Sequence, residues 1–358
     1  MREHVVIAGG GLVGLSTAVA VARRGIRCTL VSERRAGEAS PAAAGMLAPG
    51  VEHATGPAHD FGLAARDYYP EFLAWLERAT GVAVPFGPAG ILQVAATTED
   101  ASRLEADAGG NARWLTPVEL RKLEPALAPA AGALLHTRDG AVDNEVLVEV
   151  LRRYVASAAS ITVVNEAIVS IEAGSDGAAA LCASGRQYAG SAVVIATGAW
   201  TGALKGLPRA LPVEPVRGQM LELAAGPLRR VVFAGGGYLV PRSSGTTLVG
   251  STMEKVGFDS SITDDARAHL LAVAAAASPA LGAAPVLRHW AGLRPLTPDL
   301  QPIVGRDPDQ PTVVYACGHS RNGILMAPLT GDIVAALLAG EAPGHDLSAF
   351  APDRFVGA

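Results

Sequence analysis

The sequence predicts a mixed α/β fold, and three features of the 358-residue chain carry this prediction. Residues 5–31 read as strand, glycine-rich turn, helix and strand. Residues 213–253 contain several strand-like runs, and strand and helix patterns return after residue 303. Because the chain is long for one hydrophobic core, we expect two domains.

The first strand–turn–helix pattern predicts a dinucleotide site of Rossmann type. Three glycines separate the apolar run 5–8 from the helix in a G-x-G-x-x-G arrangement: Gly9, Gly11 and Gly14. Such glycines permit a tight turn, close approach of backbone to a pyrophosphate, and close packing of helix on strand. The phosphates then lie at the helix N-terminus, where free N–H groups favour an anion.

The residue that would hold the adenosine ribose is either Ser32 or Glu33. Dinucleotide sites usually end the second strand in an acidic residue about 20 residues into the unit. The helix pattern places Ser32 at that position and Glu33 one residue later. Either Glu33 holds the ribose, or the Ser32 hydroxyl shares the role.

Composition indicates a compact enzyme without a nucleic-acid partner. Charged residues make up 18% of the chain, apolar residues 49%, and the net charge is −5, so no basic footprint is present. Cys28, Cys182 and Cys317 are far apart and form no C-x-x-C pair, which favours a reducing compartment and no bound metal. No apolar run reaches the roughly 20 residues of a membrane span. We therefore expect a cytoplasmic protein with no membrane partner.

Patterns along the chain predict the remaining elements in order. Residues 36–50 are small and predict a loop that lets a ligand approach the backbone. Helical spacing occurs at residues 60–80, 98–108, 117 onward, 143–155, 264–277 and 329–338. Strand-like runs occur at residues 91–95, 161–173, 178–183, 187–195, 303–304 and 313–316, with four more between 213 and 253. The apolar run before Thr197 and Gly198 ends in small residues, which is typical of a second dinucleotide contact.

The chain starts and ends with nucleotide-fold elements and crosses a strand-rich region between them. This order predicts a discontinuous cofactor-binding domain with an antiparallel-sheet substrate domain inserted. The cofactor-binding domain is expected at residues 1–50, 141–210 and 288–358, and the substrate-binding domain at 51–140 and 211–287.

Seven separated segments resemble the D-amino-acid oxidase superfamily of flavoproteins, and most of all its glycine oxidase branch, which is associated with making the thiazole of thiamine. They are GGGLVGLSTA at Gly9, SPAAAGMLAP at Ser40, VVIATGAWTG at Val193, GYLVPR at Gly237, LVGSTMEKVGFD at Leu248, WAGLRPLTPDLQPIVG at Trp290 and GHSRNGILMAP at Gly318. The segments occur in the order of the family and span nearly the whole chain. The last two, with AAAGMLAP, are the most specific.

The resemblance implies non-covalent FAD. Carried over position by position, it places five groups of residues around the cofactor. These are Gly9, Gly11, Leu12, Val13 and Gly14 at the pyrophosphate; Ser32, Glu33 and Arg34 at the ribose; Ser40, Ala44, Gly45 and Met46 in the loop; Ile168, Thr197 and Gly198 on the central strands; and His319, Ser320, Arg321, Asn322, Gly323, Ile324 and Leu325 around the flavin.

For the substrate, the resemblance implies Arg294 and Tyr238 as catalytic residues that bind an amino-acid carboxylate. Arg321 either helps them or supports the flavin loop, and Met253 either forms the pocket wall or packs in the core. No general base is expected, and His319 is expected to be a hydrogen-bond donor of the flavin loop.

The implied reaction is oxidative deamination of glycine or a small D-amino acid. The amine becomes an imine by hydride transfer to flavin, and O2 reoxidises the flavin to give H2O2. The resemblance also implies that the product feeds thiamine thiazole synthesis. Two alternatives stay open: an oxidase of sarcosine or other N-methyl amino acids, and a flavin-dependent amino-acid dehydrogenase with another electron acceptor. A homo-oligomer is also open.

Two departures from the resemblance concern the substrate and the flavin link. Gly235, Gly236 and Gly237 stand where some glycine oxidases carry a histidine before the tyrosine, so we expect a looser or wider entrance. Gly292 stands where some sarcosine oxidases carry the cysteine that anchors flavin, so no covalent link is available there.

Overall fold

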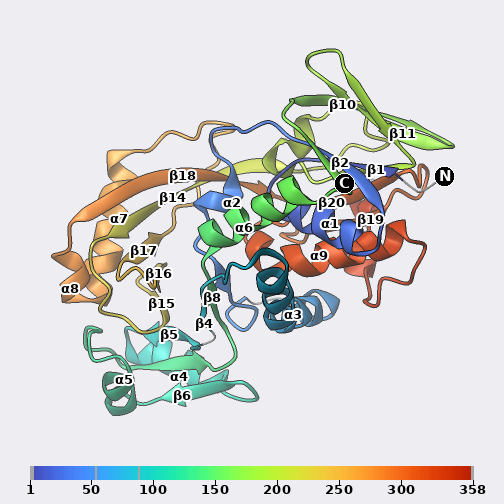
Figure 1. The fold of residues 1–358 in the computed structure, drawn as a ribbon. Coiled ribbons are helices and arrows are strands. Elements are labelled where there is room, and N and C mark those ends of the chain that lie inside the picture. The colour runs from blue at the N-terminus through green and yellow to red at the C-terminus, as the bar shows by residue number, and fades with distance from the viewer. Residues whose placement is uncertain (1–3, 53–54, 88, 356–358) are drawn as a thin grey trace.

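The computed structural model describes residues 4–52, 55–87 and 89–355, in which helices cover four β-sheets (Figure 1). The α-helices are α1 Leu12–Arg23, α2 Ala39–Ala42, α3 Pro57–Thr80, α4 Thr98–Ala106, α5 Pro117–Leu123, α6 Asn144–Ser157, α7 Asp264–Ala277, α8 Pro279–Gly282 and α9 Gly323–Leu338. Short 3-10 helices lie at Gly198–Ala203, Ser348–Phe350 and Pro352–Phe355. The expected mixed α/β fold is confirmed.

A six-stranded sheet brings the two ends of the chain together. Its order is β19-β20-β13-β1-β2-β9, and every pair except β19–β20 is parallel. The strands are β1 His4–Ala8, β2 Arg27–Val31, β9 Ile161–Val164, β13 Ala192–Ile195, β19 Ile303–Arg306 and β20 Val313–Cys317. Val5 and Ile7 of β1 join the core beneath α1, α3, α6 and α9, whereas Val6 and Ala8 face a three-stranded antiparallel sheet. Both faces are covered, which explains the continuous apolar run.

The second large sheet has eight strands in the order β18-β14-β17-β16-β15-β5-β7-β6, and only β15–β5 is a parallel pair. Its strands are β5 Ile91–Ala95, β6 Ala112–Leu115, β7 Gly132–His136, β14 Glu214–Leu223, β15 Val231–Ala234, β16 Gly237–Pro241, β17 Thr247–Gly250 and β18 Val286–Leu296. Apolar residues of α7 and α8 cover one face of this sheet. Figure 1 shows it beside the six-stranded sheet.

Two small sheets complete the fold. The first, β10-β11-β12, packs on the six-stranded sheet, and the second, β3-β8-β4, holds the small-residue loop. Their strands are β3 Met46–Leu47, β4 Phe86–Gly87, β8 Gly140–Val142, β10 Ile168–Gly174, β11 Gly177–Cys182 and β12 Gln187–Gly190. The strand-like run 161–173 is therefore two strands in different sheets.

The division into domains stays a prediction, but two elements lie across its boundaries. Strand β18 falls within 288–358 and yet pairs with β14 over ten residues in the eight-stranded sheet. Helix α3 falls within 51–140, but its buried face joins the core of the six-stranded sheet. A boundary placed after Leu296, and one that gives α3 to the cofactor side, would match these contacts.

The C-terminal helix begins earlier than the sequence predicts. It was expected at residues 329–338, whereas α9 starts at Gly323 and continues through Pro328. Proline lacks the N–H that would bond the carbonyl of Ile324, four residues back. The buried hydroxyl of Tyr69, on α3, donates to that carbonyl instead. A distant side chain thus allows proline inside the helix.

Candidate active site

A cavity of about 990 Å³ runs between the two large sheets, and we call it the central cavity. Its size is at the upper end of ligand pockets, which commonly span roughly 300–1,000 Å³. Most of the predicted cofactor residues line it: Gly9, Gly11, Leu12, Val13, Ser32, Glu33, Ser40, Ala44, Gly45, Met46, Ile168, Thr197, Gly198, His319, Ser320, Arg321, Asn322, Gly323 and Ile324. Gly14, Arg34 and Leu325 do not line it.

The glycine turn at the start of α1 is packed too tightly for a side chain at Gly9 or Gly14. Gly9 has φ +111°, and a Cβ there would lie 2.3 Å from the carbonyl oxygen of Ala196. A Cβ on Gly14 would lie 1.8 Å from the carbonyl oxygen of Gly9. Gly14 therefore serves the close packing of helix on strand, while Gly11 and Leu12 face the central cavity.

Ser40 joins the small-residue loop to the N-terminus of α1. Its hydroxyl accepts a hydrogen bond of 2.9 Å from the backbone N–H of Leu12. The fully buried Asn144 donates to the Ser40 carbonyl at 2.9 Å and accepts from Arg242 at 2.6 Å. Neither Asn144 nor Arg242 was predicted from the sequence as a functional residue. The position of Asn144, a polar residue on the apolar side of the helix that starts after Asp143, was a signal that could have indicated its role.

At the expected ribose end, Arg35 rather than Arg34 lines the central cavity. The Arg34 side chain is 67% exposed and pairs with Glu38 at 3.3 Å. Arg35 pairs with Glu33 at 3.2 Å and lies over the ring of Trp200. Arg34 does not line the cavity, and its contact with the ribose stays a prediction. Ser32 and Glu33 both line the cavity, so that choice stays open.

The N-terminus of α9 faces the same cavity as the N-terminus of α1. Asn322, Gly323 and Ile324 line the cavity, while Leu325 is 2% exposed and packs in the core. Leu325 is thus part of the core rather than the cavity wall, because the helix already begins at Gly323 and turns it inward. A helix N-terminus stabilises negative charge, so the two ends suit a pyrophosphate and an anionic ring respectively.

His319 is buried and neutral. It shares a 3.0 Å hydrogen bond with the Thr330 hydroxyl, and burial lowers the pKa of His319 to about 3. The side chain therefore joins the segment before α9 to the body of that helix. Its role as a hydrogen-bond donor of the flavin loop stays a prediction.

These walls fit FAD. The cavity is lined by the glycines Gly11, Gly45 and Gly198, whose backbone is not covered by a side chain. A Cβ on Gly198 would meet open space. A long dinucleotide with a planar ring system needs such close backbone approach at the phosphates and a helix end near the ring.

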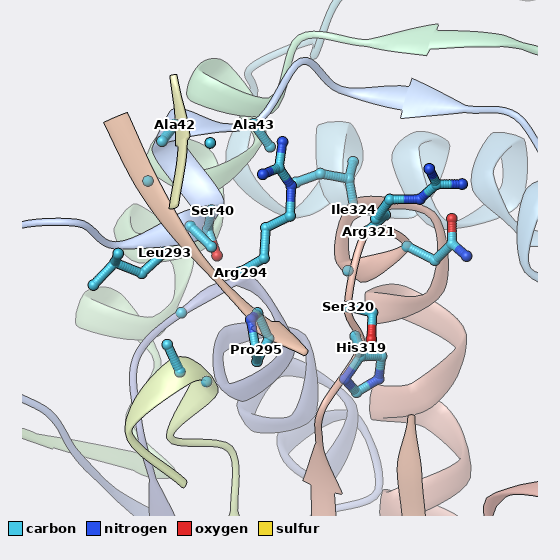
Figure 2. Close-up of a pocket in the computed structure, with 18 of the residues that line it drawn as sticks. Ser40, Ala42, Ala43, Leu293, Arg294, Pro295, His319, Ser320, Arg321 and Ile324 are labelled. Carbon is cyan, nitrogen blue, oxygen red and sulfur yellow. The ribbon is translucent and has the colours of Figure 1, made fainter. Parts of the chain in front are cut away.

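Arg294 is the one candidate substrate residue whose guanidinium has no carboxylate partner within 4.0 Å in the described ranges 4–52, 55–87 and 89–355. It donates to the Thr252 carbonyl at 3.1 Å and to the Ser251 hydroxyl at 2.6 Å. Figure 2 shows Arg294 on one side of Ile324 and Arg321 on the other, with His319 away from both guanidinium groups. The remaining N–H groups of Arg294 are available to an anion in the cavity.

The other predicted substrate residues also line the cavity, but they differ in their contacts and in their exposure. Tyr238 on β16 lies with its hydroxyl 3.9 Å from the sulfur of Met220. Arg321 is half exposed and forms an ion pair with Glu52. Met253 is 54% exposed at the cavity, which excludes the alternative of core packing.

The glycine-rich entrance is a tight hairpin turn. Gly235 and Gly236 have φ +59° and +81° and join β15 to β16, as a two-residue turn of type I′ requires. A Cβ on Gly237 would lie 2.6 Å from the carbonyl oxygen of Gly250. The strand pairing therefore fixes the backbone of these glycines, and the wider entrance expected from their missing side chains stays a prediction.

Gly218 on β14 makes room for the Arg294 guanidinium. A Cβ on Gly218 would lie 2.0 Å from Nη1 of Arg294. We expect Gly218→Ala to displace the guanidinium and to raise the KM for a carboxylate substrate at least about tenfold, since an off-rotamer side chain loses its bidentate geometry. Steady-state kinetics measure this effect, and FAD content should stay at the wild-type level. An unchanged KM would show that Arg294 does not need this space.

Burial of His319 makes the protein less stable in acid. In the unfolded chain His319 has a pKa near 6.5 and is protonated below that pH. In the folded protein it is protonated only when the pH falls to about 3. Stability is therefore complete above about pH 6.5 and falls as the pH drops toward 3, by up to roughly 1.4 kcal/mol per pH unit. Urea unfolding at pH 7 and pH 5.5 should show a smaller loss for His319→Gln than for the wild type. Equal losses would contradict a neutral His319.

The chain matches the FAD dependent oxidoreductase family (DAO) over residues 4–337. The chain belongs to this family. The resemblance seen in the seven segments is thereby confirmed, and FAD is the cofactor of this oxidoreductase.

Two relatives and one solved structure are similar to this oxidoreductase along its length. It is 37% identical to the bifunctional protein ThiO/ThiG of Synechocystis sp., with 99% of this chain and 54% of that protein covered. It is 34% identical to glycine oxidase of Geobacillus kaustophilus, with 99% and 98% covered. The crystal structure of glycine oxidase from Geobacillus kaustophilus superposes with a TM-score of 0.93 at 32% identity, with 99% and 100% covered. The chain thus spans about half the length of the bifunctional relative.

Proposed function

We propose that this oxidoreductase oxidises glycine or another small amino acid to its imine. The observation that carries the proposal is Arg294, a guanidinium in the central cavity without a carboxylate partner among the described residues. Its planar fork matches a substrate carboxylate through two parallel hydrogen bonds. The similarity to glycine oxidases over 98–100% of their length supports the same substrate class.

The side chains would act by binding and orientation. Arg294 holds the carboxylate, and the Tyr238 hydroxyl adds a second contact from β16. Bound FAD supplies the two-electron acceptor. Fixing the carboxylate restricts the position of Cα, and such orientation supplies a large share of a rate enhancement. We assign no general base, so the substrate amine must lose its proton before Cα is oxidised.

The cofactor residues of the proposal are those that line the central cavity. The N-terminus of α1 with Ser40 would hold the pyrophosphate, Ser32 and Glu33 the ribose, and the backbone at Ile168 the adenine. The segment 319–324 would lie along the flavin. Gly292 offers no thiol for a covalent link, which supports non-covalent binding.

The acceptor and the place of the reaction are part of the proposal. We expect O2 to reoxidise the flavin, with H2O2 as product, and the imine or its hydrolysis product to serve thiamine thiazole synthesis, as the resemblance to the glycine oxidase branch implies. The three cysteines are free and buried, which supports a reducing, cytoplasmic location. No helix in the described part of the chain is long and apolar enough to cross a membrane. A homo-oligomer stays untested.

Anaerobic flavin reduction tests the proposal. The yellow protein is mixed in turn with glycine, sarcosine, D-alanine, D-proline and L-alanine, and is then exposed to air with peroxide detection. Bleaching by glycine, followed by rapid peroxide formation, supports a glycine oxidase. Stronger bleaching by sarcosine would favour an N-methyl amino acid oxidase, and bleaching without reoxidation would favour a dehydrogenase. No bleaching by any compound would overturn the substrate class.

A further inference from the structure

The Arg294 guanidinium is held by a segment that leaves the eight-stranded sheet after β17. Both protein groups that bind it, the Thr252 carbonyl and the Ser251 hydroxyl, belong to this segment, residues 251–254. Met253, on the cavity wall, belongs to it as well. Where the segment lies therefore decides where the guanidinium points.

The segment is fixed from outside the cavity by a backbone bridge to β14. Arg217 and Glu254 exchange two backbone hydrogen bonds of 2.9 Å each. The backbone N–H of Gln219 donates to the Thr252 hydroxyl at 2.9 Å. These bonds leave the peptide carbonyl of Thr252 directed at Arg294.

The Glu254 side chain closes this arrangement. One carboxylate oxygen accepts from the Thr252 hydroxyl and, at 2.9 Å, from the amide of Gln219. The other accepts from Arg217, whose side chain is 5% exposed. Burial raises the pKa of Glu254, but the hydrogen bonds from Arg217, Thr252 and Gln219 together outweigh it and lower the pKa, so the carboxylate is ionised at neutral pH. None of Arg217, Gln219 and Glu254 lines the central cavity.

We propose that Glu254 is a positioning residue for Arg294: it fixes the segment 251–254, whose Thr252 carbonyl and Ser251 hydroxyl orient the guanidinium toward a substrate carboxylate. The inference rests on the proposed function, in which Arg294 binds that carboxylate. Removing the charge of Glu254 weakens its hydrogen bonds from Thr252 and Arg217, and among the described residues it leaves the buried Arg217 with Asp259 as its one anionic partner. Misplaced by even about 1 Å, such a clamp loses affinity strongly.

Acetate binding to the FAD-loaded protein tests the inference, because acetate carries a carboxylate and no amine and its binding is read from the flavin absorbance without turnover. We expect Glu254→Gln to raise the acetate Kd at least about tenfold in protein that is folded and carries FAD at the wild-type level. Substrate kinetics should show the same rise in KM, with kcat changed less than about twofold. Glu254→Asp, which keeps the charge but shortens the reach, should give a similar shift and serves if Glu254→Gln does not fold.

Glu222→Gln is the matched control. Glu222 lies on the same strand as Arg217 and Gln219, pairs with Arg288, and contacts no residue of the segment 251–254. Its acetate Kd should equal that of the wild type. An equal rise in both variants would show a general loss of sheet stability and would overturn the inference.

The double variant Glu254→Gln, Arg294→Ala separates the inference from the proposed function. If Glu254 acts through Arg294, it adds nothing once Arg294 is absent, so the double variant should bind acetate as weakly as Arg294→Ala alone. A multiplicative loss would overturn the positioning role. If Arg294→Ala by itself leaves acetate binding unchanged, the proposed carboxylate clamp fails, and the role of Glu254 fails with it.

Discussion

Replacing Arg294 with alanine should raise the KM for glycine by roughly 10²–10⁴-fold. Two charge-assisted hydrogen bonds are lost, each worth about 1.5–3 kcal/mol, and about 1.4 kcal/mol corresponds to a factor of ten in affinity. The protein groups that Arg294 contacts are a carbonyl and a hydroxyl, so its removal leaves no carboxylate exposed in the cavity. FAD content should therefore be unchanged.

Steady-state kinetics and flavin absorbance measure both parts of this expectation. Arg288→Ala is the matched control, because Arg288 lies on the same strand and forms ion pairs with Glu145 and Glu222 outside the central cavity. Its KM should equal that of the wild type. If Arg294→Ala has the KM of the wild type, Arg294 does not bind the substrate carboxylate.

Replacing Gly14 with alanine should abolish FAD binding and destabilise the fold by more than about 3 kcal/mol, since overpacking against backbone is costly. The added Cβ would lie 1.8 Å from the carbonyl oxygen of Gly9. The Gly9 backbone is itself held in place, because its N–H donates to the Val31 carbonyl of β2 at 2.9 Å. At a solvent-exposed helix position, a change from glycine to alanine raises the free energy of unfolding by up to about 1 kcal/mol. A decrease in the free energy of unfolding for Gly14→Ala would therefore indicate the close contact with Gly9.

Urea unfolding and the ratio of flavin to protein absorbance measure the change. Gly87→Ala is the control, since Gly87 has no positive φ and a Cβ there meets nothing within 4 Å. We expect the control to keep its flavin. A stable, flavin-loaded Gly14→Ala would show that the helix and strand separate more easily than their contact indicates.

The sequence predicts best where structure depends on near neighbours. The glycine spacing at residues 9–14 is typical of a strand, a turn and a helix in succession. Thr116 and Asp143 are typical residues of helix starts, and in the structure they are the N-cap residues of α5 and α6. Most of the predicted cofactor residues follow from these local patterns and from motifs that the family shares. They reach one cavity because the parallel strands end at the same edge.

What the sequence could not predict depends on distant partners. Strand β18 mixes charged and apolar residues and is recognisable only beside β14. The early start of α9 depends on the Tyr69 hydroxyl, which lies 255 residues from its acceptor at Ile324. Gly218 has no local motif, and its role appears only when Arg294 lies across it.

The order of strands in the six-stranded sheet has a consequence for synthesis of the protein. Strand β1 is made first, but β13 and β20, which complete its sheet, follow about 190 and 310 residues later. Helix α1 packs against α9, which is synthesised later still. In this contact Gly331 of α9 lies against the backbone of Ser16 of α1. Domains of a growing chain usually fold as soon as they emerge, but this one cannot. The nascent flavin site therefore stays open until β20 and α9 have been synthesised, so the cofactor is captured only after these two elements have emerged.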